Sequence, residues 1–330
     1  MKKYFILILL LLVLFTSCDI AHSDFSYEIN LVTIALDYQN TNVRNLFGTL
    51  NDAKEVEKAI RSNCEKQEIN YSSYNYYQSG YSHNTTTVNN VNYPSKTHII
   101  NALDNLESIS HTNSINIIYF SGHSNSQGSW LLATDDITNG ETFDSGDELN
   151  EDLLIRVDEV YNKLKNVKGK ILLVVDSCYS GSFYRENSYS LKEENMSFAN
   201  AFKKLISKDS EISDTYILCA TEKDNTAYEP NFNVPERLHG YFTKALLEGL
   251  GWCDGDKGLL TQYSIEAITD ENGVQGILSE GIPPASRNKI LSVDSLLSYI
   301  KRNQDIALNG ITHQYPQVSG GRFDLVLFDY

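Results

Sequence analysis

The sequence predicts an α/β fold with a mainly parallel central sheet and helices on both of its faces. Short, almost wholly apolar segments, of which residues 171–175 (Ile-Leu-Leu-Val-Val) are the clearest, are typical of strands buried on both sides. These segments alternate with stretches whose apolar residues recur at helical spacing. Nothing between residues 29 and 330 has the composition of an interdomain linker, so we expect one layered domain.

The expected elements alternate along the chain. Apolar runs of strand length predict strands at residues 29–36, 115–120, 171–175, 215–220 and 325–328. Helical spacing predicts helices at residues 51–67, 96–109, 153–164, 198–206, 242–250 and 296–300. Residues 70–93 are rich in Tyr, Asn, Ser and Thr, and we expect a surface loop or weak hairpin there. Residues 184–197 form a second polar and charged break.

The chain is acidic. Its 330 residues include 43 Asp and Glu against 27 Lys and Arg, a formal charge of −16. No basic run offsets this balance, so the phosphate backbone of a nucleic acid would be repelled. A cationic ligand, peptide or surface suits the charge better, and we expect no nucleic-acid partner.

The first residues have the pattern of an export signal. Lys2 and Lys3 precede an apolar run at residues 4–15, which is too short to span a bilayer as a helix. Residues 14–18 (Leu-Phe-Thr-Ser-Cys) resemble the lipobox of bacterial lipoproteins, which implies cleavage before Cys18 and lipid on its sulfur. An ordinary signal peptide is the alternative. We expect a signal peptide at 1–17, a tether at 18–28 and an exported, membrane-anchored protein on the periplasmic or cell-surface side.

Two of the predicted strands end in polar, glycine-containing turns. One turn is Ser121-Gly122-His123-Ser124 and the other is residues 176–181 (Asp-Ser-Cys-Tyr-Ser-Gly). Functional groups of an open parallel sheet gather at the carboxyl ends of its strands, so neighbouring strands would bring His123 and Cys178 face to face. An imidazole there can take the thiol proton, and a backbone N–H of the turn can stabilise an oxyanion. The alternative is a buried cysteine and a loop histidine that never meet.

These turns carry a resemblance to a known family. Residues 119–123 (Tyr-Phe-Ser-Gly-His) and 176–181 resemble the His and Cys signatures of caspases and, more closely, metacaspases. The separation of His123 and Cys178 (178 minus 123, or 55 positions) suits the roughly 50 residues expected for caspases. Further segments are similar to the family in the same order: residues 46–53, 132–136, 220–227, 240–243 and 314–317.

The resemblance implies a caspase-like fold over residues 29–330 and a cysteine endopeptidase that acts through His123 and Cys178. It divides the domain into a large-subunit-like part at 29–184, a polar linker at 185–197 and a small-subunit-like part at 198–330. Arg185 and Lys192 lie in the linker, where self-cleavage is a weaker hypothesis.

The resemblance also implies a specificity. Caspases read an acidic side chain with an arginine and a glutamine, where this chain has Leu46 and Asp176. The acidic pocket of metacaspases corresponds to Asp52, Ser121 and Asp176, so we expect substrates with Arg or Lys at the cleavage site. Two alternatives stay open: Asp52 caps its helix, or Asp176 only fixes its turn.

The chain departs from the family at two places. Ser124 stands where a glycine usually follows the histidine, and we expect the backbone N–H groups of Ser124 and Cys178 to form the oxyanion hole. Arg185 stands where calcium-dependent metacaspases have an aspartate, and residues 254–258 lack the remaining ligands of a calcium loop. We therefore expect no metal or other cofactor.

The five cysteines complete the prediction. If Cys18 carries lipid and Cys178 is catalytic, three remain, which argues against a disulfide framework. Cys64 and Cys219 fall in apolar patterns and are expected in the core, whereas the role of Cys253 is open. A different class of function also stays open: a catalytically silent, caspase-like binding or assembly protein at the membrane surface.

Overall fold

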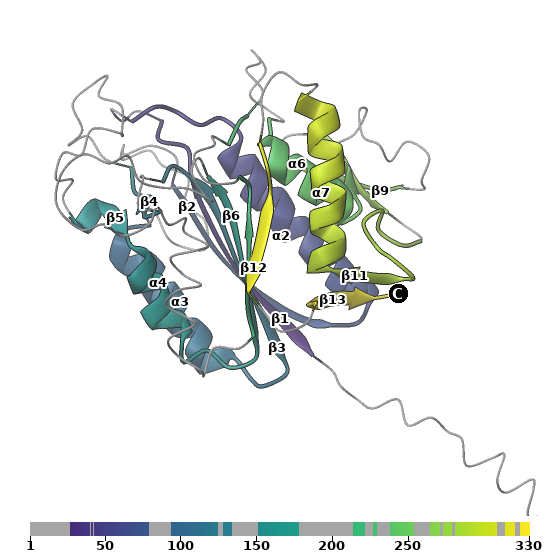
Figure 1. Cartoon of the computed structure of the whole chain (residues 1–330), viewed down its shortest axis with the longest axis horizontal. Helices are drawn as coiled ribbons and strands as arrows, with labels where there is room; N and C mark the ends of the chain where they lie inside the picture. Colours follow the sequence, from purple (N-terminus) through teal and green to yellow (C-terminus); the bar gives the residue numbers. More distant parts are fainter. Residues whose placement is uncertain are drawn as a thin grey trace, which may run out of the picture.

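The protein is built around a six-stranded sheet with helices on both faces (Figure 1). The computed structural model describes residues 27–39, 41, 43–78, 94–124, 128–133, 151–177, 214–221, 227–229, 238–253, 265–270, 273–278, 281–308, 314–320 and 324–330.

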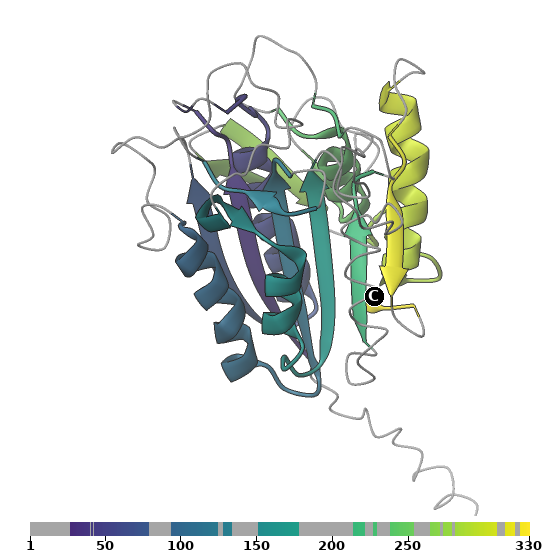
Figure 2. The same ribbon diagram turned by 60° about the vertical axis from the view of Figure 1, so that its left-hand side comes forward.

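The central sheet is parallel except at one edge. Its strand order is β12-β7-β6-β3-β1-β2, and only β12 runs antiparallel to its neighbour. In Figure 2 the arrowheads of the parallel strands point to the upper end of the molecule, and that of β12 points the opposite way. The strands are β1 (Glu28–Leu36), β2 (Asn70–Gln78), β3 (Ser114–Gly122), β6 (Lys170–Ser177), β7 (Thr215–Cys219) and β12 (Gln317–Gly320).

Two helical layers cover the sheet (Figure 1). α3 (Lys96–Ile109) and α4 (Val157–Leu164) lie on one face, and α2 (Thr49–Lys66), α6 (Tyr241–Gly249) and α7 (Val293–Leu308) on the other. Each layer has its own hydrophobic core. Because both faces are covered, all nine residues of β3 are buried, which explains the uninterrupted apolar run at residues 117–120.

Shorter strands lie outside this sheet. They form an antiparallel sheet of order β8-β10-β9 and two pairs, β4 with β5 and β11 with β13. Their bounds are β4 (Trp130–Leu131), β5 (Leu154–Ile155), β8 (Trp252–Cys253), β9 (Ile265–Asp270), β10 (Gly273–Leu278), β11 (Ile290–Ser292) and β13 (Val326–Asp329), and a single 3-10 turn spans Glu151–Leu153.

Two expectations are wrong. The first nine residues of the expected loop at 70–93 form β2, which pairs with β1 from Asn70 to Gln78. An edge strand has one hydrogen-bonding neighbour and a partly exposed surface, so its polar and tyrosine-rich sequence lacks the apolar signal of a central strand. The helix expected from residue 153 begins at Val157, because the preceding residues form a 3-10 turn and β5. The expected helix at 198–206 lies outside the described residues.

Candidate functional site

The first residues of the two polar turns lie side by side at the carboxyl ends of β3 and β6. The strands pair in parallel, and their last pair is Gly122 with Ser177. One residue further along each strand come His123 and Cys178. The Oγ atoms of Ser124 and Ser177 lie 3.1 Å apart, so the residue after the histidine touches the residue before the cysteine. Cys178 itself lies outside the described residues.

His123 is fixed from two sides. Its backbone N–H donates to the Tyr38 hydroxyl at 2.7 Å, and the two rings lie with their centroids 4.6 Å apart. Tyr38 in turn donates to the carbonyl of Leu131 at 2.8 Å, which anchors it in the core. The His123 Nε2 atom lies 2.7 Å from the carbonyl oxygen of Arg44. The imidazole is therefore oriented before any substrate arrives.

These contacts determine which ring nitrogen is basic. A carbonyl oxygen only accepts hydrogen bonds, so Nε2 of His123 carries the proton and Nδ1 keeps a lone pair. Burial lowers the pKa of His123 to about 4, although the Arg44 carbonyl opposes this change. The imidazole is thus neutral at physiological pH, the state that a proton acceptor needs.

The three residues expected in the substrate pocket line one cavity. Asp52 lies in the first turns of α2, Ser121 near the end of β3 and Asp176 near the end of β6. All three are buried. The cavity wall also includes Leu46, Thr49, Gly122, Ser177, Ala227, Tyr228, Glu229 and Gly240. The cavity adjoins both polar turns, since its wall includes Gly122 of the His123 turn and Ser177, the residue before Cys178.

The Asp52 and Asp176 carboxylates face each other across Gly240. A Cβ atom on Gly240 would lie 2.7 Å from Asp176 Oδ2 and 3.5 Å from Asp52 Oδ2. Burial raises the pKa of Asp52 to about 6, although its bond to His239 lowers it in part. Burial and the nearby charge of Asp52 raise the pKa of Asp176 to about 7. Two buried carboxylates this close favour a cation between them.

Neither alternative for these carboxylates describes the structure. The N-cap of α2 is Gly48, and Asp52 bonds instead to His239 Nδ1 at 2.7 Å and to the Gly240 N–H at 3.2 Å. Asp176 accepts from the Thr243 hydroxyl at 2.5 Å, and that hydroxyl lies 2.7 Å from the Tyr119 hydroxyl. Both carboxylates thus join separate elements around the cavity.

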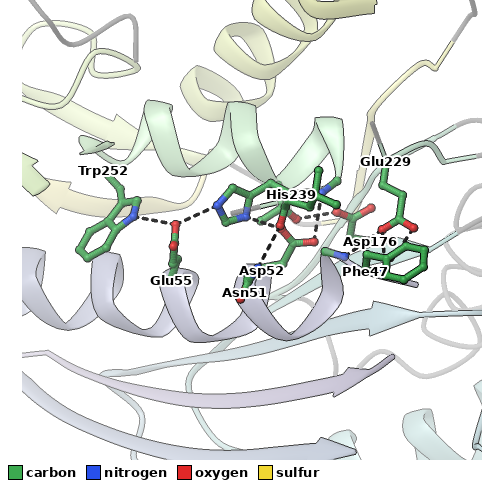
Figure 3. A network of polar contacts seen from close by, with 12 residues as sticks. Phe47, Asn51, Asp52, Glu55, Asp176, Glu229, His239 and Trp252 are labelled. Atoms are coloured by element: carbon green, nitrogen blue, oxygen red, sulfur yellow. Dashed lines mark hydrogen bonds and ion pairs between the residues drawn. The ribbon is translucent and has the colours of Figure 1, made fainter. Parts of the chain in front are cut away.

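The structure adds a third carboxylate that the sequence did not indicate. Glu229 lines the cavity and accepts from the backbone N–H groups of Phe47 and Gly48 at about 3 Å (Figure 3). It is held there by Gln314, which accepts from the Tyr228 N–H and donates to the Ala220 carbonyl. Ala220 and Gln314 belong to two of the segments that resemble the family, and their hydrogen bond supports this wall.

His239 is the second addition. It lies between Asp52 and Glu55 and is buried with them (Figure 3). A lone histidine before a predicted helix gave no signal. The signal that could have indicated a buried cationic partner is the pair Asp52 and Glu55, because two acidic residues three positions apart fall on the same side of a helix as its apolar residues.

The remaining expectations concern residues of other regions. Cys64 and Cys219 are buried free thiols, as expected. Cys18, the segment 1–26, the linker 185–197 and residues 254–258 lie outside the described residues. Within the part of the chain that the structure describes, no helix has the length and apolar character needed to cross a membrane, and no three His, Cys, Asp or Glu side chains are grouped as a metal site.

Comparison with known proteins finds a family model and solved structures to which the chain is similar. A family model described as "Metacaspase, peptidase C14 domain" matches residues 31–186, which include both turns. A solved structure titled "structure of pro-sf-caspase-1" matches with 10% identity and a TM-score of 0.50, covering 92% of this chain and 91% of its own. The crystal structure of caspase-1 from Spodoptera frugiperda matches with 11% identity and a TM-score of 0.49, covering 94% and 95%. No curated protein matches.

Proposed function

Because a metacaspase peptidase model matches residues 31–186, we propose that the chain is a cysteine endopeptidase of the caspase and metacaspase family that cleaves peptide bonds after Arg or Lys. The observation that supports this specificity is the pair of buried carboxylates, Asp52 and Asp176, in one cavity beside the His123 turn. A family of peptidases implies a protein substrate, and the cavity suggests which side chain of that protein is read.

A basic side chain satisfies this cavity electrostatically. A guanidinium or ammonium group between Asp52 and Asp176 would stabilise both ionised carboxylates and lower their pKa values. An acidic side chain would add a further negative charge to Asp52, Asp176 and Glu229. An apolar one would leave buried charges unpaired, at a cost of roughly 3–5 kcal/mol.

The proposed chemistry begins with the neutral His123. Its Nδ1 takes the Cys178 thiol proton while the sulfur attacks the scissile carbonyl carbon, and the carbonyl oxygen becomes an oxyanion. The intermediate collapses to a thioester as the imidazolium gives its proton to the leaving amine. Water then attacks the thioester, with the imidazole again accepting a proton, and the thiol and a carboxylic acid are released.

The backbone N–H groups of Ser124 and Cys178 are the proposed oxyanion hole. Ser124 is held by its own hydroxyl against Ser177 and by a β-bridge to Trp130, so the turn is ordered where the oxyanion would form. Removing one such donor typically costs about 3–4 kcal/mol in the barrier.

A panel of fluorogenic peptides that differ only in the residue before the scissile bond tests the proposal. Hydrolysis after Arg and Lys is expected from the wild type, and none from Cys178→Ala or His123→Ala. Preferred hydrolysis after Asp would overturn the pocket assignment. Wild-type protein that neither cleaves the panel nor reacts with an Arg-directed acyloxymethyl ketone would indicate the catalytically silent binding protein instead.

We also propose a lipid anchor on Cys18, supported by the lipobox-like residues 14–18. Metabolic labelling with an alkyne fatty acid should mark the wild type and leave Cys18→Ala unlabelled. Labelling of both proteins, or of neither, would contradict the anchor.

Independence from calcium is a further proposal, and equal activity with and without chelator is the expected result.

A further inference from the structure

A buried ionic chain runs from the cavity into the core between α2 and α6. His239 Nδ1 lies 2.7 Å from Asp52 Oδ1, and His239 Nε2 lies 3.0 Å from Glu55 Oε2 (Figure 3). Trp252 Nε1 donates to the same Glu55 oxygen at 2.9 Å. The exposed fractions of Asp52, Glu55 and His239 are 2%, 3% and 4%, so water does not screen these charges. Within this ionic chain, Asp52 is the member that also lines the cavity.

The His239 imidazole balances the negative charges of this ionic chain. Asp52 and Glu55 are three positions apart on α2, so their carboxylates project from one side of the helix. Two buried carboxylates at this spacing repel each other unless a cation lies between them. The approach of His239 to Glu55 is poorly directed for a hydrogen bond, and we interpret it as an ion pair.

The residue after His239 extends the same contact to the cavity wall. The Gly240 N–H donates to Asp52 Oδ2 at 3.2 Å, so both oxygens of Asp52 are held by consecutive residues. The backbone of His239 and Gly240 passes so close to Gly48 that a Cβ there would lie 3.2 Å from it. Segment 238–240 is thus packed directly onto the first turn of α2.

We propose that His239 is a positioning residue for the recognition of a basic substrate side chain. It holds the Asp52 carboxylate in place from the side away from the cavity and balances the charge of Asp52 and Glu55. The inference rests on the proposed function, and it names the group that keeps one wall of the pocket anionic. His239 does not line the cavity and acts through Asp52.

The titratable groups around the ionic chain determine how the loss of the His239 charge changes the pKa of Asp52. They are Asp52 and Glu55 on α2, Asp176 on β6, Tyr119 on β3, and Glu229. Burial lowers the pKa of His239, but the adjacent carboxylates of Asp52 and Glu55 outweigh this and raise the pKa to about 10. The bond to His239 lowers the pKa of Asp52, so removing the imidazolium should raise that pKa. Fewer Asp52 side chains would then be ionised at neutral pH.

His239→Gln is the first variant, because glutamine keeps hydrogen bonding and removes the charge. Below about pH 6, where Asp52 is mainly protonated, each unit by which its pKa rises should raise KM for an Arg substrate roughly tenfold, with kcat within a factor of about two. The acidic limb of kcat/KM against pH should move to higher pH. Asn63→Ala is the matched control, because Asn63 also joins α2 to the end of α6 through a buried bond to Leu250. It should lower Tm without changing KM.

The double variant Glu55→Gln/His239→Gln separates positioning from charge balance in the core. Removing both buried charges should recover Tm relative to His239→Gln, while KM stays high. Recovery of KM together with Tm would reduce His239 to a structural role and overturn the inference.

A measurement on the wild type keeps the test decisive if His239→Gln does not fold. The imidazole ¹⁵N shifts of His239 should be those of the doubly protonated ring up to about pH 8. A neutral His239 at pH 7 would overturn the inference. An unchanged KM in folded His239→Gln would also overturn the inference, but it would leave the proposed function standing. Wild-type protein that does not hydrolyse peptides after Arg or Lys would overturn the proposed function itself.

Discussion

Two opposing effects act on the pKa of Asp176. Burial and the Asp52 charge favour its protonated form, whereas the hydrogen bond from Thr243 favours the carboxylate. The balance puts its pKa at about 7, so a bound cation would change its protonation at physiological pH. This single side chain therefore couples substrate binding to proton release.

Asp176→Asn should weaken recognition of basic substrates. Asparagine can still accept from Thr243 but carries no charge, and losing one partner of a buried charge pair costs about 2–5 kcal/mol, a factor of roughly 30 or more. Steady-state kinetics should show the loss chiefly in KM. Asp104→Asn removes a half-exposed carboxylate on α3 that pairs with Lys163, and should leave KM unchanged. Equal losses in both variants would contradict a pocket role for Asp176.

The same pKa values predict how stability changes with pH. The folded-state pKa values of Asp52 and Asp176 lie above the unfolded value near 4, so the folded state binds more protons. Their contribution to stability is full below about pH 4 and is lost as pH rises through 6–7. Agmatine, a small guanidinium compound, should therefore raise Tm more at pH 8 than at pH 5.5. In Asp176→Asn the difference between the two pH values should shrink. A difference as large as that of the wild type would contradict the assignment of this pH dependence to Asp176.

At the residue scale, sequence reasoning located the site residues that adjoin strand ends. Ser121, His123 and Asp176 lie at the carboxyl ends of two apolar strands, where a parallel sheet gathers side chains. His239 and Glu229 reach the same place from segments without periodicity, through contacts more than 180 positions apart in sequence. No local pattern encodes such a contact.

At the element scale, α6 is the part whose position matters most to the cavity. Its N-cap, Gly240, lies between the carboxylates of Asp52 and Asp176. Thr243, one turn further on, bonds Asp176. The start of this helix thus sets the distance between the two sides of the pocket.

Gly240→Ala should disturb the pocket. Its new Cβ would meet Asp176 Oδ2 at 2.7 Å, closer than real Cβ atoms come to other atoms, so α6 or Asp176 must move. We expect a loss of about 1–3 kcal/mol in stability and a higher KM for Arg substrates, measured by thermal unfolding and kinetics. Gly249→Ala, on the same helix, meets the side chains of Leu296 and Tyr299 and should leave KM unchanged. A Gly240→Ala enzyme with normal KM would contradict this role of α6.

The elements that sequence reasoning found are those with strong periodicity. β3 and β6 are buried on both faces, and α3 spans the same residues as its apolar pattern. Of the missed elements, β2 is polar, β4 and β8 have only two residues each, and β9 and β10 pair with each other outside the central sheet. Their pairing is stabilised by tertiary contacts, so their own sequences give little indication that they form strands.

At the scale of the whole molecule, the charge of −16 should affect substrate capture. An anionic protein attracts a cationic peptide over about 10 Å at 0.1 M salt and much less at 1 M. Raising NaCl from 50 to 500 mM should lower kcat/KM roughly three- to tenfold for a peptide with several flanking lysines. A peptide with a single Arg should be affected less. Equal effects on both peptides would indicate that the overall charge plays no part.

The chain enters the sheet at the end opposite to the cavity. Glu28, at the start of β1, pairs with Ser114 at the start of β3, whereas Ala35 pairs with the cavity residue Ser121. The seven residue steps from Glu28 to Ala35 place roughly 23 Å between these ends, at about 3.3 Å per residue. A molecule fastened to a bilayer through the residues before Tyr27 would turn its pocket outward, toward proteins arriving from the surrounding fluid and away from the lipid that holds it.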